Sequence, residues 1–112
     1  MATNKQTITK EMLENLGIIS INIENKEITR WNKRGTKQLV TKMTPSEQHN
    51  SKVNTNKVSY KHYICCIRGK TYSFSNIVYA WFVGPIPSGF LIDHINGNTD
   101  DNRPDNLRLY TQ

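Results

Sequence analysis

A carboxylate and an imidazole stand side by side near the end of the chain, where Asp93 precedes His94 in the stretch IDHINGNTDDNRPDNLRLYTQ. A carboxylate supplies the hard oxygen that a divalent cation such as Mg²⁺ prefers. A neutral imidazole can take a proton from an attacking water near neutral pH. The pair therefore predicts phosphodiester hydrolysis, with Asp93 holding the cation and His94 acting as the base.

An Asp-His pair also fits a plain turn, in which the aspartate caps backbone amides beside an exposed histidine. The residues that follow favour the catalytic interpretation, because NGN and DDNRPDN predict an irregular loop that folds back on itself. Asn106 ends this loop, and its amide could bond the ring of His94 or the adjacent backbone and so fix the ring. Arg108 is expected to share the face of Asn106 and could hold a phosphate.

Three elements before the pair are expected to position it. Two strand-like runs flank the turn RGK, which predicts a hairpin over residues 58–75. A short buried helix follows over SNIVYAWFVG, with Ser75 as its candidate cap. GPIPSG ends that helix, and the strand FLID then brings Asp93 and His94 to a loop rim, where both are expected to converge on one ligand. LRLY is predicted to pair with FLID.

The N-terminal half predicts a further set of small elements. TKEMLENLG is typical of a short helix that is capped by Thr9 and ended by Gly17. IISINI and EITRWN predict a hairpin. From Gly35 to Lys57 the composition becomes polar, which predicts a loop with one short strand at KQLVTK.

Positive charge is concentrated in the middle of the chain. Residues 26–75 hold eleven Lys or Arg against two Glu, a net charge of +9, whereas residues 76–112 sum to −2 and the whole chain to +6. This distribution indicates a surface for a polyanion and, separately, a site for a cation. The alternative is that the lysines only keep a small protein in solution.

The composition argues against several classes of protein. No run approaches the ~20 apolar residues of a membrane span, and the first residues lack the apolar core of a secretion signal. Cys65 and Cys66 are adjacent, so they do not readily pair with each other, and no second cysteine pair completes a zinc site. We expect both to be strand residues in a reducing compartment. His49 and His62 have no ligand partners at suitable spacing and are predicted to play no catalytic part.

The stretch DHINGNTDDNRPDNLRLYT resembles the core of the HNH endonucleases, in particular the homing type of phages and mobile elements. The family motif reads roughly Asp-His-x-x-Gly-Asn, then Asp/Asn-Asn-Arg, then Asn-Leu-Arg, and the spacing here agrees over residues 93–111. A weaker resemblance runs through most of the chain, in the order of its helices and hairpins.

This resemblance implies an α+β fold in which two β-hairpins and short helices lead into an incomplete ββα-metal (HNH) motif. It implies that Asp93 is a metal ligand, that His94 is the general base and that Asn106 positions the histidine. The implied cofactor is a divalent metal, Mg²⁺ with Mn²⁺ as the alternative, and the implied partner is double-stranded DNA. Family members continue into a helix with a final Asn or His ligand, which a chain ending at Gln112 is expected to lack.

The expected organisation places an N-terminal helix, hairpin and basic loop in residues 1–57 and a nuclease core in residues 58–112, within one compact unit. A cytoplasmic location is expected, in a bacterial host cell, for a protein encoded by a phage or mobile element. DNA contacts are predicted for basic residues of both parts, namely Lys33, Arg34, Lys37, Arg68, Lys70, Arg103 and Arg108.

Two functions of different classes stay open at this point. One is a metal-dependent endonuclease that nicks or cleaves DNA. The other is a catalytically impaired relative that acts by binding DNA or by blocking a host or phage protein. In a third arrangement a protein partner or a second copy of the chain covers the C-terminal edge, which predicts an exposed apolar groove around Leu107, Leu109 and Tyr110.

Overall fold

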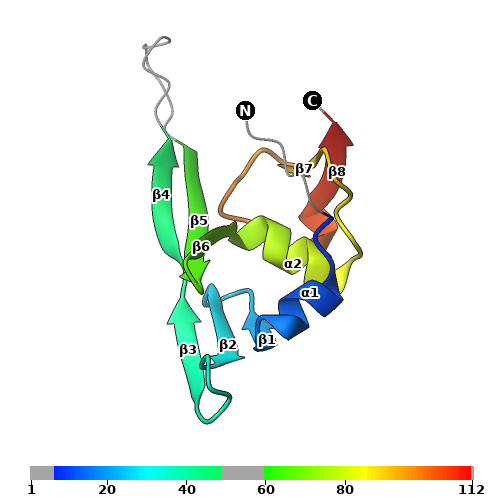
Figure 1. Cartoon of the computed structure of the whole chain (residues 1–112). Helices are drawn as coiled ribbons and strands as arrows, with labels where there is room; N and C mark the ends of the chain where they lie inside the picture. Colours follow the sequence, from blue (N-terminus) through cyan, green and yellow to red (C-terminus); the bar gives the residue numbers. More distant parts are fainter. Residues whose placement is uncertain (1–6, 49–59, 112) are drawn as a thin grey trace.

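The computed structural model describes residues 7–48 and 60–111, which fold into small antiparallel sheets around a central helix (Figure 1). The predicted α+β class is confirmed. In chain order the elements are α1 (Lys10–Asn15), β1 (Ile18–Asn22), β2 (Glu27–Trp31), β3 (Gln38–Lys42), β4 (Thr44–Gln48), β5 (Tyr60–Ile67), β6 (Lys70–Ser73), α2 (Phe74–Phe82), β7 (Phe90–His94), a 3₁₀ turn (Pro104–Asn106) and β8 (Leu107–Thr111).

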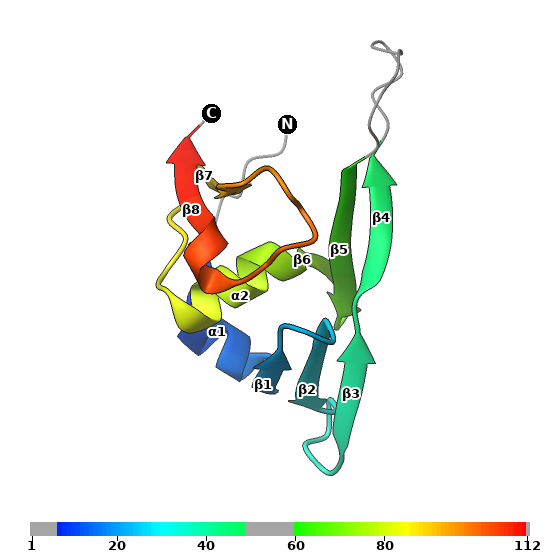
Figure 2. The same cartoon turned by 180° about the vertical axis from the view of Figure 1, so that it is seen from behind.

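The strands form three separate sheets, in the orders β1-β2-β3, β4-β5-β6 and β7-β8. Helix α2 lies between the β4-β5-β6 sheet and the β7-β8 hairpin in both views (Figures 1 and 2). It contacts α1, β5, β6, β7 and β8. The helix is therefore the common support on which the C-terminal hairpin rests.

The hydrophobic core is centred on α2, which contributes the fully buried side chains of Phe74, Ile77 and Val78. Leu13 of α1 and Ile28 of β2 pack into the same cluster. Burial of each such side chain stabilises the fold by about 1.5–3 kcal/mol relative to exposure. Because the cluster joins the N-terminal elements to α2, it ties both halves of the chain into one core.

The local predictions for the first helix and both hairpins are confirmed. The Thr9 hydroxyl accepts a hydrogen bond from the amide of Met12 at 3.1 Å, and Gly17 follows the helix with a φ of +93° that suits glycine. β1 pairs with β2, and β5 pairs with β6. Arg68 and Gly69, with φ values of 53° and 78°, provide the positive φ that a tight hairpin turn needs.

The loop predicted between Gly35 and Lys57 is only partly a loop. The short strand expected at residues 37–42 is present as β3, but a further strand, β4, follows at once and pairs with β5. Pro45 lies within β4, which is tolerated because β4 is an edge strand of its sheet. The polar composition gave no signal for this strand, because β4 forms by pairing with β5 and has no apolar pattern of its own.

Ser75 does not cap α2 as predicted. β6 continues to Ser73 and the helix begins at Phe74, so the N-cap position falls on Ser73, two residues before the predicted cap. Ser75 is buried in the first turn, where its Oγ lies 2.9 Å from Oγ of Ser73. Over the described ranges, no helix has the length and apolar character to span a membrane.

The apolar groove predicted at the C-terminal edge is not formed by the three residues named for it. Leu107 is buried in the core, and Leu109 packs against that core. Tyr110 is exposed. The sequence does not show which side chains of β8 are buried, because that depends on how the hairpin packs on α2.

Candidate functional site

The β7-β8 hairpin carries the Asp-His pair at the point where its two strands part. Asp93 is paired with Arg108 and His94 with Leu107, so His94 is still a strand residue. Successive side chains of a strand point to opposite faces. The side chains of Asp93 and His94 therefore point to opposite faces of β7. Asp93 contacts Arg108, whereas His94 contacts Asn102. The expected convergence at a loop rim is not seen, because β7 continues one residue further than FLID.

His94 is buried and is held through one ring nitrogen. His94 is only 8% exposed, and its Nε2 is 2.8 Å from Oδ1 of Asn102, which is itself 4% exposed. An amide oxygen can only accept a hydrogen bond, so Nε2 must donate. In a neutral ring the proton is then on Nε2, and Nδ1 keeps the lone pair that a base needs.

Asn102, and not Asn106, is thus the residue in contact with the imidazole. The sequence contained a signal for it, since Asn102 stands in the DDNR part of the motif. Linear order cannot show which of several loop asparagines reaches the ring. That choice depends on how the loop closes.

Asn106 closes the loop from its other end. Its Oδ1 accepts from the backbone amide of Asn96 at 3.1 Å, and its Nδ2 donates to Oδ1 of Asn96 at 3.0 Å and to the carbonyl of Asp101 at 2.9 Å. Its own carbonyl accepts from the amide of Ile95. Asn106 precedes Leu107, the cross-strand partner of His94, so its side chain falls beside the start of the loop. It braces the backbone that follows His94.

Further polar contacts fix the rest of the loop. The side chains of Asn96 and Asn98 each accept from a backbone amide two residues ahead, at 2.8 and 3.0 Å. Asp101 accepts from Nε and Nη2 of Arg103, both at 2.9 Å. This hydrogen-bonded ion pair holds the pKa of Asp101 well below its ordinary value and raises that of Arg103. The loop is therefore ordered by its own side chains.

Asp93 forms an ion pair with Arg108, directly across the hairpin. Nε and Nη2 of the guanidinium both lie 2.9 Å from the same carboxylate oxygen, Oδ2. The side chains are 40% and 61% exposed, respectively. Ion pairs with this exposure generally contribute less than about 1 kcal/mol. The predicted metal ligand and a predicted phosphate ligand are thus bound weakly to each other.

The side chains that could hold a divalent cation are few. In residues 7–48 and 60–111 there is no group of three or more His, Cys, Asp or Glu arranged for a metal ion. Mg²⁺ is often held by one or two carboxylates, with waters and substrate phosphates completing the shell. Asp93 fits a site of that kind, because its carboxylate is hard and accessible.

The N-terminal half touches the loop through Lys26. Its ammonium lies 3.2 Å from Oδ1 of Asp100 and 4.9 Å from the ring centre of Tyr63 on β5. A hydrogen bond between Tyr63 and Asp100, together with burial, raises the pKa of the phenol. Lys26 stands in the turn between β1 and β2 with a φ of +55°. This contact links the N-terminal hairpin, β5 and the loop that carries Asn102.

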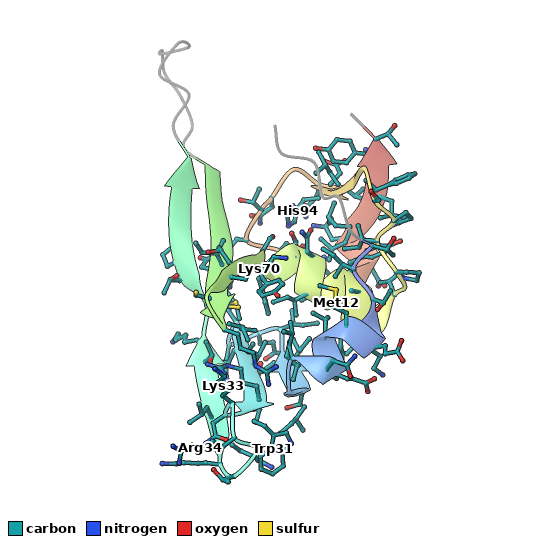
Figure 3. All side chains as sticks on the ribbon, in the orientation of Figure 1. Met12, Trp31, Lys33, Arg34, Lys70 and His94 are labelled. Carbon is teal, nitrogen blue, oxygen red and sulfur yellow. The ribbon has the colours of Figure 1, made fainter. Side chains whose placement is uncertain are left out.

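The residues predicted to contact DNA fall into separate places. Lys33, Arg34 and Lys37 are exposed in the turn between β2 and β3, and Figure 3 places the first two in the lower part of the molecule, away from His94. Arg68 and Lys70 are exposed at the β5-β6 turn. Arg103 and Arg108 belong to the β7-β8 hairpin, and both form ion pairs with carboxylates.

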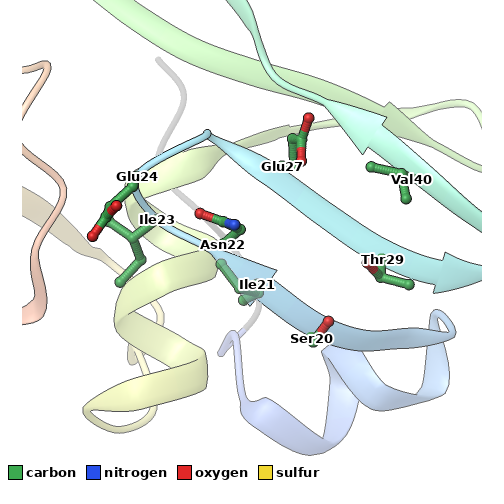
Figure 4. A pocket seen from close by; sticks show the side chains of 8 residues that line it. All are labelled: Ser20, Ile21, Asn22, Ile23, Glu24, Glu27, Thr29 and Val40. Atoms are coloured by element: carbon green, nitrogen blue, oxygen red, sulfur yellow. The ribbon is translucent and has the colours of Figure 1, made fainter.

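A pocket of about 570 Å³ lies elsewhere, on the β1-β2-β3 sheet (Figure 4). Glu24, Glu27 and Val40 are among its lining side chains, and it includes none of the predicted site residues. It is an open depression on a sheet face. We assign it no part in the chemistry.

The remaining sequence predictions concern side chains outside the hairpin. Cys65 and Cys66 are confirmed as strand residues of β5, and both are free. Cys65 is buried, and burial raises the pKa of its thiol to about 11. His49 lies outside the described residues, as does the side chain of His62, so the prediction for these two histidines stays a prediction.

Comparisons with known proteins agree with the motif in the hairpin. A family model described as HNH endonuclease matches residues 72–112, the part of the chain that includes α2, β7, the loop and β8. Searches of curated proteins and of solved structures found no match. The resemblance seen in the sequence is confirmed: residues 72–112 form a domain of the HNH endonuclease family.

Proposed function

We propose that the protein is a metal-dependent endonuclease that hydrolyses phosphodiester bonds of double-stranded DNA. HNH endonucleases act on DNA and generally use a divalent metal, which supports both parts of the proposal. The observation that carries it is the buried imidazole of His94, held through Nε2 by Asn102 and adjacent in sequence to an accessible carboxylate. The alternative of a plain turn with an exposed histidine does not fit a ring that is buried and hydrogen-bonded.

In the proposed reaction His94 takes a proton from the attacking water at Nδ1. Asn102 keeps the proton of the neutral ring on Nε2, so Nδ1 stays unprotonated and its direction is set. Asn106 acts on the loop backbone beside the ring. Asp93 would hold Mg²⁺, or Mn²⁺ as the alternative, and the bound cation would supply charge stabilisation for the phosphate and the leaving oxygen.

Affinity for DNA would come from the basic residues, whose phosphate contacts are independent of sequence. The exposed cations of the two turns suit this task because, in the described part of the chain, none of them forms an ion pair with a carboxylate. Those of the β7-β8 hairpin would first have to leave their carboxylates. The residues proposed are Lys33, Arg34, Lys37, Arg68, Lys70, Arg103 and Arg108.

A second candidate function is DNA binding without cleavage. The observation that favours it is the contact between Asp93 and Arg108, which occupies the carboxylate on which the metal would depend. In this case the basic surface would be retained and the protein would act by occupying DNA or a competing protein. The two candidates differ in whether the protein cleaves DNA and whether that cleavage depends on His94.

A nicking assay on supercoiled plasmid with Mg²⁺ or Mn²⁺ separates them. We expect nicking by the unaltered chain and a loss of about 10²- to 10⁴-fold in His94→Ala, the usual contribution of a general base. Cys66→Ser, an exposed change on β5, is the control and should nick as the unaltered chain does. Salt-sensitive DNA binding with no nicking in any metal would favour the second candidate. Equal nicking by His94→Ala would contradict the proposed role of the histidine.

A further inference from the structure

Arg108 and Asp93 are cross-strand partners on one face of the β7-β8 hairpin. Two donors of the guanidinium, Nε and Nη2, reach the same oxygen, Oδ2, at 2.9 Å each. The geometry joins the only two charged side chains of β7 and β8 in a single pair. The carboxylate proposed for a cation is therefore neutralised by the protein itself.

A metal ion and Arg108 cannot both be held closely by Asp93 at little cost. A divalent cation on the carboxylate would lie within a few ångströms of the guanidinium, and charges of like sign repel strongly at such distances. The pair is well exposed, so the bond that must be broken is weak. A guanidinium that is released there has a suitable alternative partner, since its planar fork matches the oxygens of a phosphate.

We propose that Arg108 is an exchangeable counter-ion: it occupies Asp93 in the free protein and moves to a DNA phosphate when the cation takes its place. The inference rests on the proposed function, because it takes Asp93 as the metal ligand. Its consequence is that metal and DNA favour each other's binding, since each stabilises the state that the other needs. Arg108 is a positioning residue in this scheme and is distinct from the base.

The first test measures Mn²⁺ binding to the protein alone, by electron paramagnetic resonance titration without DNA. Arg108→Gln should bind Mn²⁺ about fivefold more tightly, as expected when a weak competing ion pair is removed. Arg108→Lys keeps the charge without the two-donor contact and should fall between. Arg34→Gln removes an equal charge at the far hairpin and should leave the affinity unchanged, whereas Asp93→Asn should lose the site (Figure 3).

The second test uses no metal and measures binding of a short fluorescent DNA duplex in the presence of a chelator. Asp93→Asn should bind the duplex more tightly, because Arg108 is no longer held by a carboxylate. The gain should disappear when Arg108→Gln is added. It should persist when Arg34→Gln is added instead, since distant changes are additive.

The outcomes separate this inference from the proposed function. Equal Mn²⁺ affinity in Arg108→Gln and Arg34→Gln, with binding abolished in Asp93→Asn, overturns the exchange and leaves Asp93 as a ligand. A gain in DNA affinity that survives Arg108→Gln also overturns it. Unchanged Mn²⁺ affinity in Asp93→Asn would show that Asp93 is not the metal ligand. That result would overturn this part of the proposed function and, with it, the competition between the cation and Arg108.

Discussion

Two hairpins carry most of the residues to which a function is assigned, and they are built in opposite ways. In the β7-β8 hairpin the polar side chains of His94, Asn102 and Asn106 are buried and bonded to neighbouring groups. In the β2-β3 hairpin the cations are exposed, and the turn is held mainly by Asn32, which bonds Thr36 and the amide of Lys37. One hairpin fixes orientation, and the other displays charge.

The difference follows from the chemistry that each hairpin would perform. A general base must present one nitrogen in one direction, so its neighbours have to be fixed and desolvated. Attraction between a lysine and a phosphate depends on distance and salt and needs little direction. Single substitutions in the β7-β8 hairpin should therefore cause large losses of activity. Those in the β2-β3 hairpin should cause small, additive losses of DNA affinity. The predictions below test this contrast, from the largest expected effect to the smallest.

Among substitutions that leave His94 in place, the largest effect is expected at Asn102. Asn102→Ala should lower nicking by about 10- to 100-fold, the usual range when the partner that orients a functional histidine is removed. Asn102→Asp keeps an oxygen that can accept from Nε2 and should lose less. Nitrogen-15 NMR of His94 provides a second readout, because the fraction of the neutral ring that is protonated on Nε2 should fall in Asn102→Ala. Unchanged activity and an unchanged ring spectrum would mean that the contact does not orient the base.

Asn106→Ala should mainly affect stability. The variant removes the part-buried hydrogen bonds to the amide of Asn96 and to the carbonyl of Asp101, at a cost of about 0.5–1.5 kcal/mol for each. Urea unfolding measures the total loss, and hydrogen exchange should place the added opening in residues 95–106. Uniformly faster exchange across all elements would show that Asn106 supports the fold as a whole and not the loop.

Lys26→Met tests a link between the β1-β2 turn and the loop that carries Asn102. The change removes the ion pair with Asp100 and the contact with the Tyr63 ring while keeping an apolar stem. We expect a fall of a few-fold in nicking and a coupling energy with Asp100→Asn below about 1 kcal/mol, as for other exposed pairs. Lys42→Met, an exposed lysine on β3, is the control. Equal effects of the two variants would remove Lys26 from the positioning of the loop.

Lys33→Gln and Arg34→Gln should each weaken DNA binding only slightly. Each change should also reduce the slope of log affinity against log salt by about 0.9, the value for one phosphate contact. Fluorescence anisotropy over a series of salt concentrations measures both quantities, and the double variant should show the sum. A loss of nicking at saturating DNA would mean that this hairpin contributes to catalysis as well as to binding.

The smallest effect is expected from pH at the rim of the loop. Arg103 lowers the pKa of Asp101 below its ordinary 3.8. A carboxylate with a lowered pKa adds stability above its ordinary value and loses that contribution as the pH falls toward the lowered one. The difference in melting temperature between the unaltered chain and Asp101→Asn should therefore narrow in acid below that ordinary value. A constant difference would show that the ion pair does not stabilise the loop.

Local signals in the sequence were sufficient for several elements. Thr9, Gly17 and the Arg68-Gly69 turn each act on neighbouring residues, so their predicted roles could be read without knowledge of the fold. The prediction for Ser75 was wrong because the helix start is decided by where β6 ends its pairing with β5. β4 was missed for a similar reason, since an edge strand with a proline depends on its neighbour for nearly all its hydrogen bonds.

By itself, the sequence determined which chemical groups are present and their order, and from these the HNH motif of residues 93–111 could be identified. Only the tertiary structure decided which groups meet: Asn102 with His94, Asn106 with the loop backbone, and Arg108 with Asp93. The physical reason is the register of β7 and β8. It places Arg108 opposite Asp93 and Leu107 opposite His94, and it closes the loop between the two strands; neither result can be read from residue types alone.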